Sequence, residues 1–114
     1  MAVLKFENHE PKIGSNVYLA DGSYVIGQAS LGHKVSVWFN SIIRADVNYI
    51  DIGENTNIQD LSILHVTSEN PLIIGRNVTV GHSVILHACT VEDGCLIGMG
   101  AKVLDGAIIG KNSL

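Results

Sequence analysis

Aliphatic residues recur at every sixth position over most of this chain, and a small or polar residue usually follows each of them. The repeat starts near Val25 and continues to the end of the sequence in four registers. An internal period of this kind indicates a repeat architecture, in which each unit packs only against its neighbours. The leading residues are Leu31, Val37 and Ile43, then Ile52, Ile58 and Leu64, then Ile74, Val80 and Leu86, and finally Val91, Ile97, Val103 and Ile109.

Small or branched residues form a second series, four positions after most of the leads. The series contains Val35, Ser41, Ser62, Val78, Val84, Cys95, Ala101, Ala107 and Ser113. In a solenoid, each six-residue unit forms a short strand and a bend, three units make a triangular coil, and the leads fill its interior. Neighbouring coils pair through their backbones at a spacing of about 4.8 Å. The pattern predicts an all-β fold, a parallel β-helix with three strands per coil, that occupies residues 1–114 as a single domain.

Two breaks in the register predict insertions. Ile43 and Ile52 are nine positions apart, three more than one unit. Leu64 and Ile74 are ten positions apart and enclose a polar segment with a proline. Such residues favour a turn or loop over a strand. We therefore expect a loop insertion near residues 67–71, extruded from one corner of the helix.

Composition supports strands and argues against several classes of protein. Val and Ile together outnumber Leu by 26 to 10, and β-branched side chains suit a pleated surface. The net charge of −4 and the absence of a basic patch argue against nucleic acid as a partner. Two cysteines, Cys89 and Cys95, are too few for a disulfide framework and fit a reducing compartment. Without a leader segment or a long apolar run, we expect a soluble cytoplasmic protein that does not bind membranes.

The breaks also decide which polar residues share a face. The residues that follow the leads on one side of the prism are Arg44, His65 and His87, which are separated by 21 and 22 positions. These separations equal one coil of 18 plus the inserted three or four residues. The three side chains should therefore form one outward column. His65 and His87 are then one coil apart, close enough for both imidazoles to reach a metal at about 2.0–2.1 Å.

His82 lies on the preceding face and cannot join His65 and His87 within one subunit without distortion. In a threefold trimer, an adjacent subunit presents this face to them. Three neutral imidazoles with an open fourth position make a catalytic zinc site. Imidazole ligands also suit iron and cobalt, so the identity of the metal stays open. The alternative, that the three histidines are polar surface residues, also stays open at this point.

Residues 40–110 resemble the γ-class carbonic anhydrase family of hexapeptide-repeat proteins. The resemblance is carried by residues 44–46, 57–60 with His65, 80–82, 87–89, 97–101 and 104–107. It implies a left-handed β-helix and a homotrimer with a metal ion at each interface. It also implies that His65 and His87 come from one subunit and His82 from its neighbour, in agreement with the count of faces.

The resemblance implies the reversible hydration of carbon dioxide to bicarbonate by a zinc-bound hydroxide. Arg44 and Asp46 would form an ion pair across the interface, with Arg44 near the bound bicarbonate. Gln59 would hold the metal-bound water or hydroxide, and Asp60 would help to fix the interface and that network. A zinc ion lowers the pKa of bound water from about 15.7 to about 7, and carbonic anhydrase is the type case of this effect.

Two features depart from the pattern of the family. Val47 stands where the archaeal prototype has a glutamate. The short segment 67–71, with Glu69 as its only acidic residue, stands where the prototype has an acidic loop with a proton-shuttling glutamate. Both departures predict slow proton export. The expected carbon dioxide hydration activity is therefore weak or absent. The sequence also stops inside a repeat at Leu114. We therefore expect a C-terminally truncated form or a fragment of a longer chain.

Two other functions are compatible with the repeat. One is an acyltransferase or thioesterase that acts on coenzyme A esters between subunits. It does not account for Arg44, Gln59 and three histidines together. The other is a metal-stabilised assembly module without catalysis, which the short loop and the missing shuttle glutamate both favour.

Overall fold

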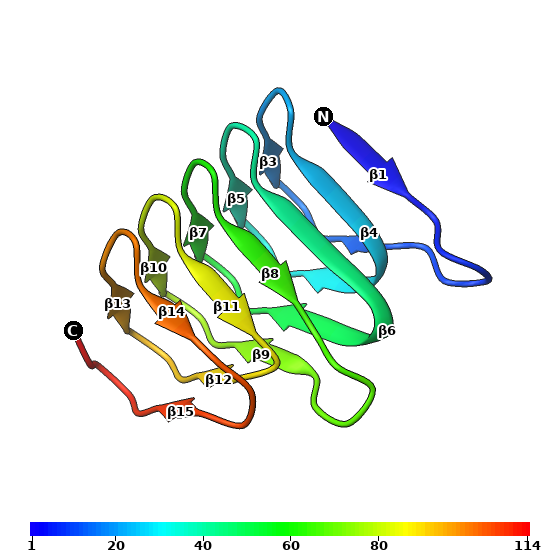
Figure 1. Ribbon diagram of the computed structural model, residues 1–114. Coiled ribbons are helices and arrows are strands. Elements are labelled where there is room, and N and C mark those ends of the chain that lie inside the picture. The colour runs from blue at the N-terminus through cyan, green and yellow to red at the C-terminus, as the bar shows by residue number, and fades with distance from the viewer.

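The computed structural model describes all 114 residues and consists of strands, turns and bends. Short strands stack in about five coils, which Figure 1 shows from the side. The first strands are β1 (Ala2–Leu4), β2 (Lys12–Ile13), β3 (Tyr18–Leu19), β4 (Tyr24–Leu31), β5 (Ser36–Val37), β6 (Ile42–Ile52), β7 (Asn57–Ile58) and β8 (Ile63–His65). The others are β9 (Leu72–Ile74), β10 (Thr79–Val80), β11 (Ile85–His87), β12 (Thr90–Val91), β13 (Leu96–Ile97), β14 (Lys102–Val103) and β15 (Ile108–Ile109). No helix long and apolar enough to cross a membrane is present.

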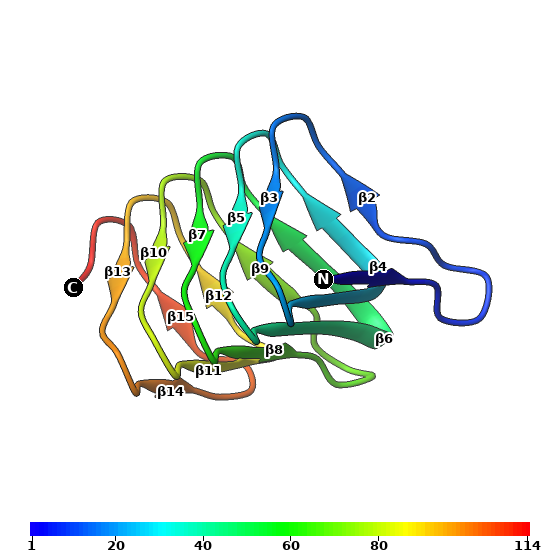
Figure 2. The same cartoon turned by 90° about the horizontal axis from the view of Figure 1, so that it is seen from above.

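The coils present three faces, and every pairing between named strands is parallel. Face A consists of β1, β8, β11, β14 and the N-terminal halves of β4 and β6. Face B is a separate five-stranded sheet in the order β13-β10-β7-β5-β3. Face C consists of β2, β9, β12, β15 and the C-terminal halves of β4 and β6, which bend round a corner and join faces A and C (Figure 2). The predicted all-β, left-handed parallel β-helix is confirmed.

The predicted leads fill the interior of the prism. Every lead from Leu31 to Val91 is 3% exposed or less, and Ile97 is 6% exposed. The last two leads, Val103 and Ile109, are partly buried and pack against the same cluster. Burial of one aliphatic side chain contributes roughly 1.5–3 kcal/mol. The leads of the three faces therefore contribute a large part of the stability of the fold.

Small polar residues are buried at the corners because each hydroxyl bridges two coils. Ser41 Oγ donates to the carbonyl oxygen of Gln59 at 2.6 Å and accepts from the Ser62 amide at 3.1 Å. Ser62 repeats this pattern one coil later, with the carbonyl oxygen of Gly81 at 3.0 Å and the Val84 amide at 3.2 Å. A buried hydroxyl is tolerated only when it is hydrogen-bonded. These bonds explain why serine serves as well as valine at corner positions.

Tight corners place one residue per turn in the left-handed region of backbone conformation. Asparagine and glycine adopt this conformation at lower cost than other residues. Five asparagines occupy it, as expected for such residues: Asn16, Asn40, Asn55, Asn77 and Asn112, with φ between 55° and 60°. Other residue types adopt it as well, among them Leu61, with φ of 64° and an exposed side chain.

Both register breaks lie at the corner between faces A and C. In β6 the register slips, so that Ala45 and Ile50 face Gly27 and Ala29 of β4, and three additional residues bulge outward. The second break falls between β8 and β9, where residues 66–71 lie outside any strand. The side-chain amide of Asn48 donates to the carbonyl oxygens of Thr67 and Ser68 at 3.2 and 3.3 Å. The two insertions therefore support each other beside the end of β8.

Candidate metal centre

The column that the spacing predicts is present on face A. Strand β11 lies beside β8 in a register that pairs His87 with His65. Strand β6 lies beside β8 with Ile43 opposite Leu64, which places Arg44 next to His65 on the following position. All three side chains leave the sheet on its outer side, since their neighbours Ile43, Leu64 and Leu86 fill the interior.

The two imidazole rings of the column face each other, and each is held from behind by an aspartate. His65 Nδ1 lies 3.2 Å from His87 Nε2. The opposite nitrogen of His65, Nε2, lies 3.0 Å from Asp46 Oδ1. The opposite nitrogen of His87, Nδ1, lies 2.5 Å from Asp105 Oδ1. Each ring thus has one nitrogen on a carboxylate and one directed at the other ring.

This arrangement fits a divalent metal ion. A carboxylate accepts hydrogen bonds, so the nitrogen facing each aspartate carries the ring proton in a neutral imidazole. The two inner nitrogens then both present lone pairs, which repel each other unless a cation lies between them. Two nitrogens bound to one tetrahedral metal at 2.0–2.1 Å are separated by about 3.3 Å, close to the 3.2 Å between His65 and His87. Carboxylates behind metal-binding imidazoles are the usual arrangement in protein metal sites.

Asp46, whose carboxylate contacts the column, has a lowered pKa. Burial by itself raises its pKa, but hydrogen bonds from the Val47 amide and from His65, together with the charge of Arg44, lower it below the ordinary value. Its second oxygen lies 2.5 Å from Arg44 Nη1. The ion pair between Arg44 and Asp46 that the resemblance places across an interface therefore forms within a single chain. Asp46 is ionised at neutral pH and accepts a hydrogen bond from the Nε2–H group of His65.

His82 lies apart from the column, at the corner between faces B and A. It follows β10, its ring is about half exposed, and its Nδ1 lies 3.1 Å from Asp60 Oδ1. No group of three potential ligands comes together within one chain. This agrees with the expectation that His82 cannot reach His65 and His87 within one subunit. Its Nε2 has no partner in the chain and is free to bind a metal elsewhere.

The remaining predicted residues lie near His82, away from the column. Gln59 follows β7, and its Nε2 donates to Asn57 Oδ1 at 3.0 Å. Asn57 in turn donates to Thr79 Oγ1 at 3.1 Å. Asp60 contacts His82 and no other histidine. The seven predicted residues therefore form two groups at opposite ends of face A: Arg44, Asp46, His65 and His87 at one end, and Gln59, Asp60 and His82 at the other.

Sequence analysis did not identify Asp105 as part of this centre. The repeat gave no signal for it, because this coil is 17 residues long: Val103 pairs with Leu86, so Leu104 takes the position beside His87 and Asp105 follows at the turn. Cys89, by contrast, takes no part. Its side chain is 2% exposed and packs in the hydrophobic core, on the opposite side of the chain from the outward-facing column. Burial raises the pKa of its thiol to about 11.

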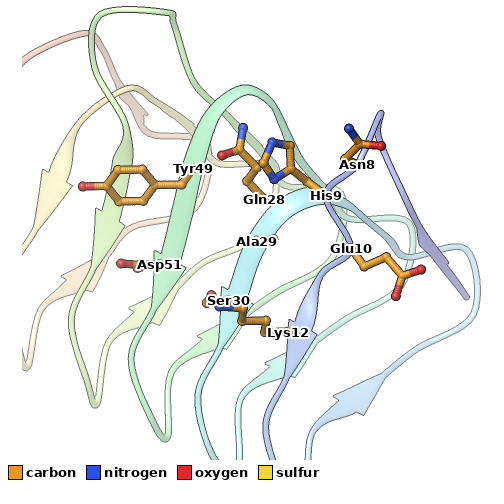
Figure 3. Close-up of a pocket in the computed structure, with 9 residues that line it drawn as sticks. All are labelled: Asn8, His9, Glu10, Lys12, Gln28, Ala29, Ser30, Tyr49 and Asp51. Atoms are coloured by element: carbon orange, nitrogen blue, oxygen red, sulfur yellow. The ribbon is translucent and has the colours of Figure 1, made fainter.

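A hollow of about 330 Å³ lies on the face C side of the bulge in β6 (Figure 3). It contains none of the predicted site residues, although Gln28 at its edge donates to the backbone carbonyl of Asp46 at 3.4 Å. Small-molecule sites are mostly lined by apolar side chains, whereas seven of the nine residues that line this hollow are polar or charged. We therefore do not assign it as the active site. Its lining residues are Asn8, His9, Glu10, Lys12, Gln28, Ala29, Ser30, Tyr49 and Asp51.

Comparison with known proteins gives relatives of two kinds. No family model matches the chain. The mitochondrial gamma carbonic anhydrase 2 of Arabidopsis thaliana is 43% identical over 110 residues, which are 91% of this chain and 40% of the relative. A carbonic anhydrase of Geobacillus kaustophilus is 45% identical over 109 residues, which are 96% of this chain and 60% of the relative.

Among solved structures, that of a candidate acetyltransferase of Bacillus cereus superposes with a TM-score of 0.90 at 36% identity. The match covers 98% of this chain and 72% of that one. The chain spans 40% to 60% of the length of the two curated relatives described above. The identity to the curated gamma carbonic anhydrases and the shared hexapeptide-repeat fold show that the chain belongs to the γ-class carbonic anhydrase-like family of hexapeptide-repeat proteins.

Proposed function

We propose that this chain is a γ-class carbonic anhydrase-like metalloenzyme that interconverts carbon dioxide and bicarbonate in the cytoplasm. The observation that carries the proposal is the pair of inner nitrogens of His65 and His87, 3.2 Å apart, with a carboxylate behind each ring. Two converging lone pairs need a cation, and imidazole ligands suit zinc, with iron and cobalt as alternatives. The carbonic anhydrases among the relatives support the reaction.

A homotrimer would complete the site at each interface. The ligand set of one chain is divided between the two ends of face A, with His65 and His87 at one end and His82 at the other. A rotation that brings the second end of one copy against the first end of the next supplies three imidazoles to one metal. Such heterologous contacts close into a ring when the rotation is threefold. A fourth position then stays open for the reacting species, as in catalytic zinc sites.

The predicted site residues other than the histidines would each have a task at this metal. A bound zinc ion would supply hydroxide at neutral pH by lowering the pKa of water to about 7, an effect for which carbonic anhydrase is the type case. Arg44, half exposed and held by Asp46, offers a cation to bicarbonate at the edge of the column. Gln59 lies close to His82 and would reach the reacting oxygen from the neighbouring subunit. Asp60 holds the His82 ring by its Nδ1.

Hydration of carbon dioxide by stopped flow, on anaerobically purified protein of known metal content, tests the proposal. We expect activity with one metal ion per subunit, and loss of both metal and activity in His87→Ala. His33→Ala is the matched control, because His33 contacts Ser15 at 2.6 Å and none of the site residues. The proposed site is wrong if His87→Ala retains full metal occupancy. Metal binding without turnover in the wild type would favour an assembly module without catalysis.

A coenzyme A-dependent acyltransferase or thioesterase is the second candidate, because the Bacillus cereus structure is that of a candidate acetyltransferase. Hydrogen exchange with and without coenzyme A separates the two functions. Protection of residues 70–74 at the start of β9 would favour the acyl-group enzyme. The carbonic anhydrase proposal predicts that exchange in this segment does not change.

A further inference from the structure

Each of the three histidines has an aspartate on the ring nitrogen that would not bind a metal. Asp46 holds His65, Asp60 holds His82, and Asp105 holds His87. The contact of Asp105 is the shortest of the three, at 2.5 Å between its Oδ1 and His87 Nδ1. Neither the repeat nor the family resemblance assigned a role to Asp105, and its carboxylate contacts only His87.

Asp105 reaches His87 because the two residues stand on adjacent coils. Strand β14 pairs with β11 so that Val103 faces Leu86, and the chain turns immediately afterwards. The turn is closed by Gly106, with φ of 77°, whose amide donates to the carbonyl oxygen of Ala88 at 2.8 Å. The Asp105 side chain is half exposed, whereas the His87 ring is 31% exposed. The carboxylate therefore covers the back of the ring and leaves its front toward His65.

The position of this carboxylate decides which nitrogen of His87 carries the proton. A neutral imidazole has one N–H, and the hydrogen bond made by one nitrogen fixes the state of the other. With Asp105 present, Nδ1 carries the proton and Nε2 presents a lone pair to His65. Without Asp105, the proton can move to Nε2 and be donated to His65 Nδ1, which already lies 3.2 Å away. The two histidines would then hydrogen-bond to each other and close the metal site.

We propose that Asp105 is a positioning residue that keeps His87 in its Nδ1–H form, so that the pair of histidines stays open to a metal ion. The inference rests on the proposed metal site but not on the reaction catalysed there. Loss of a carboxylate behind a metal-binding imidazole typically weakens metal affinity about 10-fold to 100-fold.

Two variants separate the position of the group from its charge. Asp105→Ala removes the acceptor, whereas Asp105→Asn keeps an oxygen that can accept the Nδ1 proton. Asp51→Ala is the matched control, because Asp51 is an exposed carboxylate on face C that contacts no histidine. Affinity for Zn²⁺ and Co²⁺ is measured by competition with a chromophoric chelator. We expect Asp105→Ala to bind about 10-fold to 100-fold more weakly, Asp105→Asn to lose less, and Asp51→Ala to match the wild type.

The ring nitrogens themselves give a readout that does not depend on metal or turnover. Nitrogen-15 NMR of the metal-free full chain near pH 8.5, well above the ordinary histidine pKa of about 6.5, distinguishes the two neutral forms of His87. We expect the Nδ1–H form in the wild type and in Asp105→Asn, and the Nε2–H form in Asp105→Ala. An Asp105→Ala protein that keeps the Nδ1–H form and wild-type metal affinity overturns the inference. A wild type that binds metal but does not hydrate carbon dioxide refutes the proposed function and leaves this inference standing.

Discussion

Asp46 makes three polar contacts, because it alternates with buried Ala45 in β6 and so lies on the same outer side of the strand as Arg44. Arg44, two residues earlier, and the His65 ring of the next coil both contact it, and the Val47 amide donates to it at 2.8 Å. The family resemblance implied an ion pair between Arg44 and Asp46 across an interface. It did not predict that the pair closes within one chain.

The lowered pKa of Asp46 predicts a dependence of stability on pH. A carboxylate with a lowered folded pKa stabilises the fold above its unfolded value of about 3.9, and this contribution is lost as the pH falls through the lowered folded value. At pH 7 we expect metal-free Asp46→Asn to unfold with a free energy about 1.5–3 kcal/mol lower than the wild type, as for a hydrogen bond to a charged group. Urea denaturation at pH 7 and at pH 2.5 measures the difference. It should shrink at the lower pH; an equal difference at both values would show that charge plays no part.

At the scale of the strand, the period of six residues predicted the leads from Leu31 to Ile97 as buried, because burial is decided by the position of a residue within its unit. It did not identify Ile50, Val66 and Leu72, which are buried next to the two insertions. The corners were less predictable. The repeat does not reveal that β4 and β6 continue through a corner as single strands, nor that Leu61 adopts a left-handed conformation. These features arise from contacts between coils, which a period along one chain does not describe.

Neighbouring isoleucines on face A and face B provide a test of the interior. Ile58 in β7 is fully buried, whereas Ile63 in β8 points outward and is 38% exposed. Replacement of a buried isoleucine by alanine typically costs about 2–5 kcal/mol through lost contacts and the cavity left behind. We expect Ile58→Ala to lower the free energy of unfolding by this amount and Ile63→Ala to lower it by less than half as much. Similar losses in both variants would contradict the assignment of the leads.

Replacement of Leu61 tests the strain at a corner. Its left-handed backbone costs roughly 1–2 kcal/mol in a residue with a bulky side chain, and its side chain is 58% exposed. Asparagine occupies the equivalent place one coil earlier, at Asn40. We expect Leu61→Asn to raise the thermal midpoint of the chain. Leu96→Asn, an exposed leucine in β13, is the control and should not raise it.

At the scale of the whole molecule, the two groups of site residues stand at opposite ends of face A, and neither is complete. The column at one end has two imidazoles with converging lone pairs, and the corner at the other end has a single imidazole with a free Nε2. Counting units along the sequence predicted this division. It did not predict Asp105, because Leu104 occupies the position of the column one coil after His87, and Asp105 reaches the ring from the turn that follows.

Complementation between two inactive variants tests whether one site is built from two copies. His82→Ala lacks the corner imidazole, and His87→Ala lacks half of the column. If each site joins the column of one copy to the corner of the next, about one quarter of the sites in a randomly mixed trimer have both intact parts, because each part is intact in half of the subunits. We expect co-expression of the two variants to restore metal binding to about that fraction of wild type, measured on the purified assembly.

The control mixture pairs His65→Ala with His87→Ala, which both damage the column. No subunit of that mixture has an intact column, so metal binding should stay absent whatever the arrangement of copies. Restoration by the first mixture and not by the second requires that His82 act on the column of another subunit. If neither mixture recovers metal while both variants still assemble, the three imidazoles do not share one ion. The lone pairs of His65 and His87 would then have to be satisfied within a single chain.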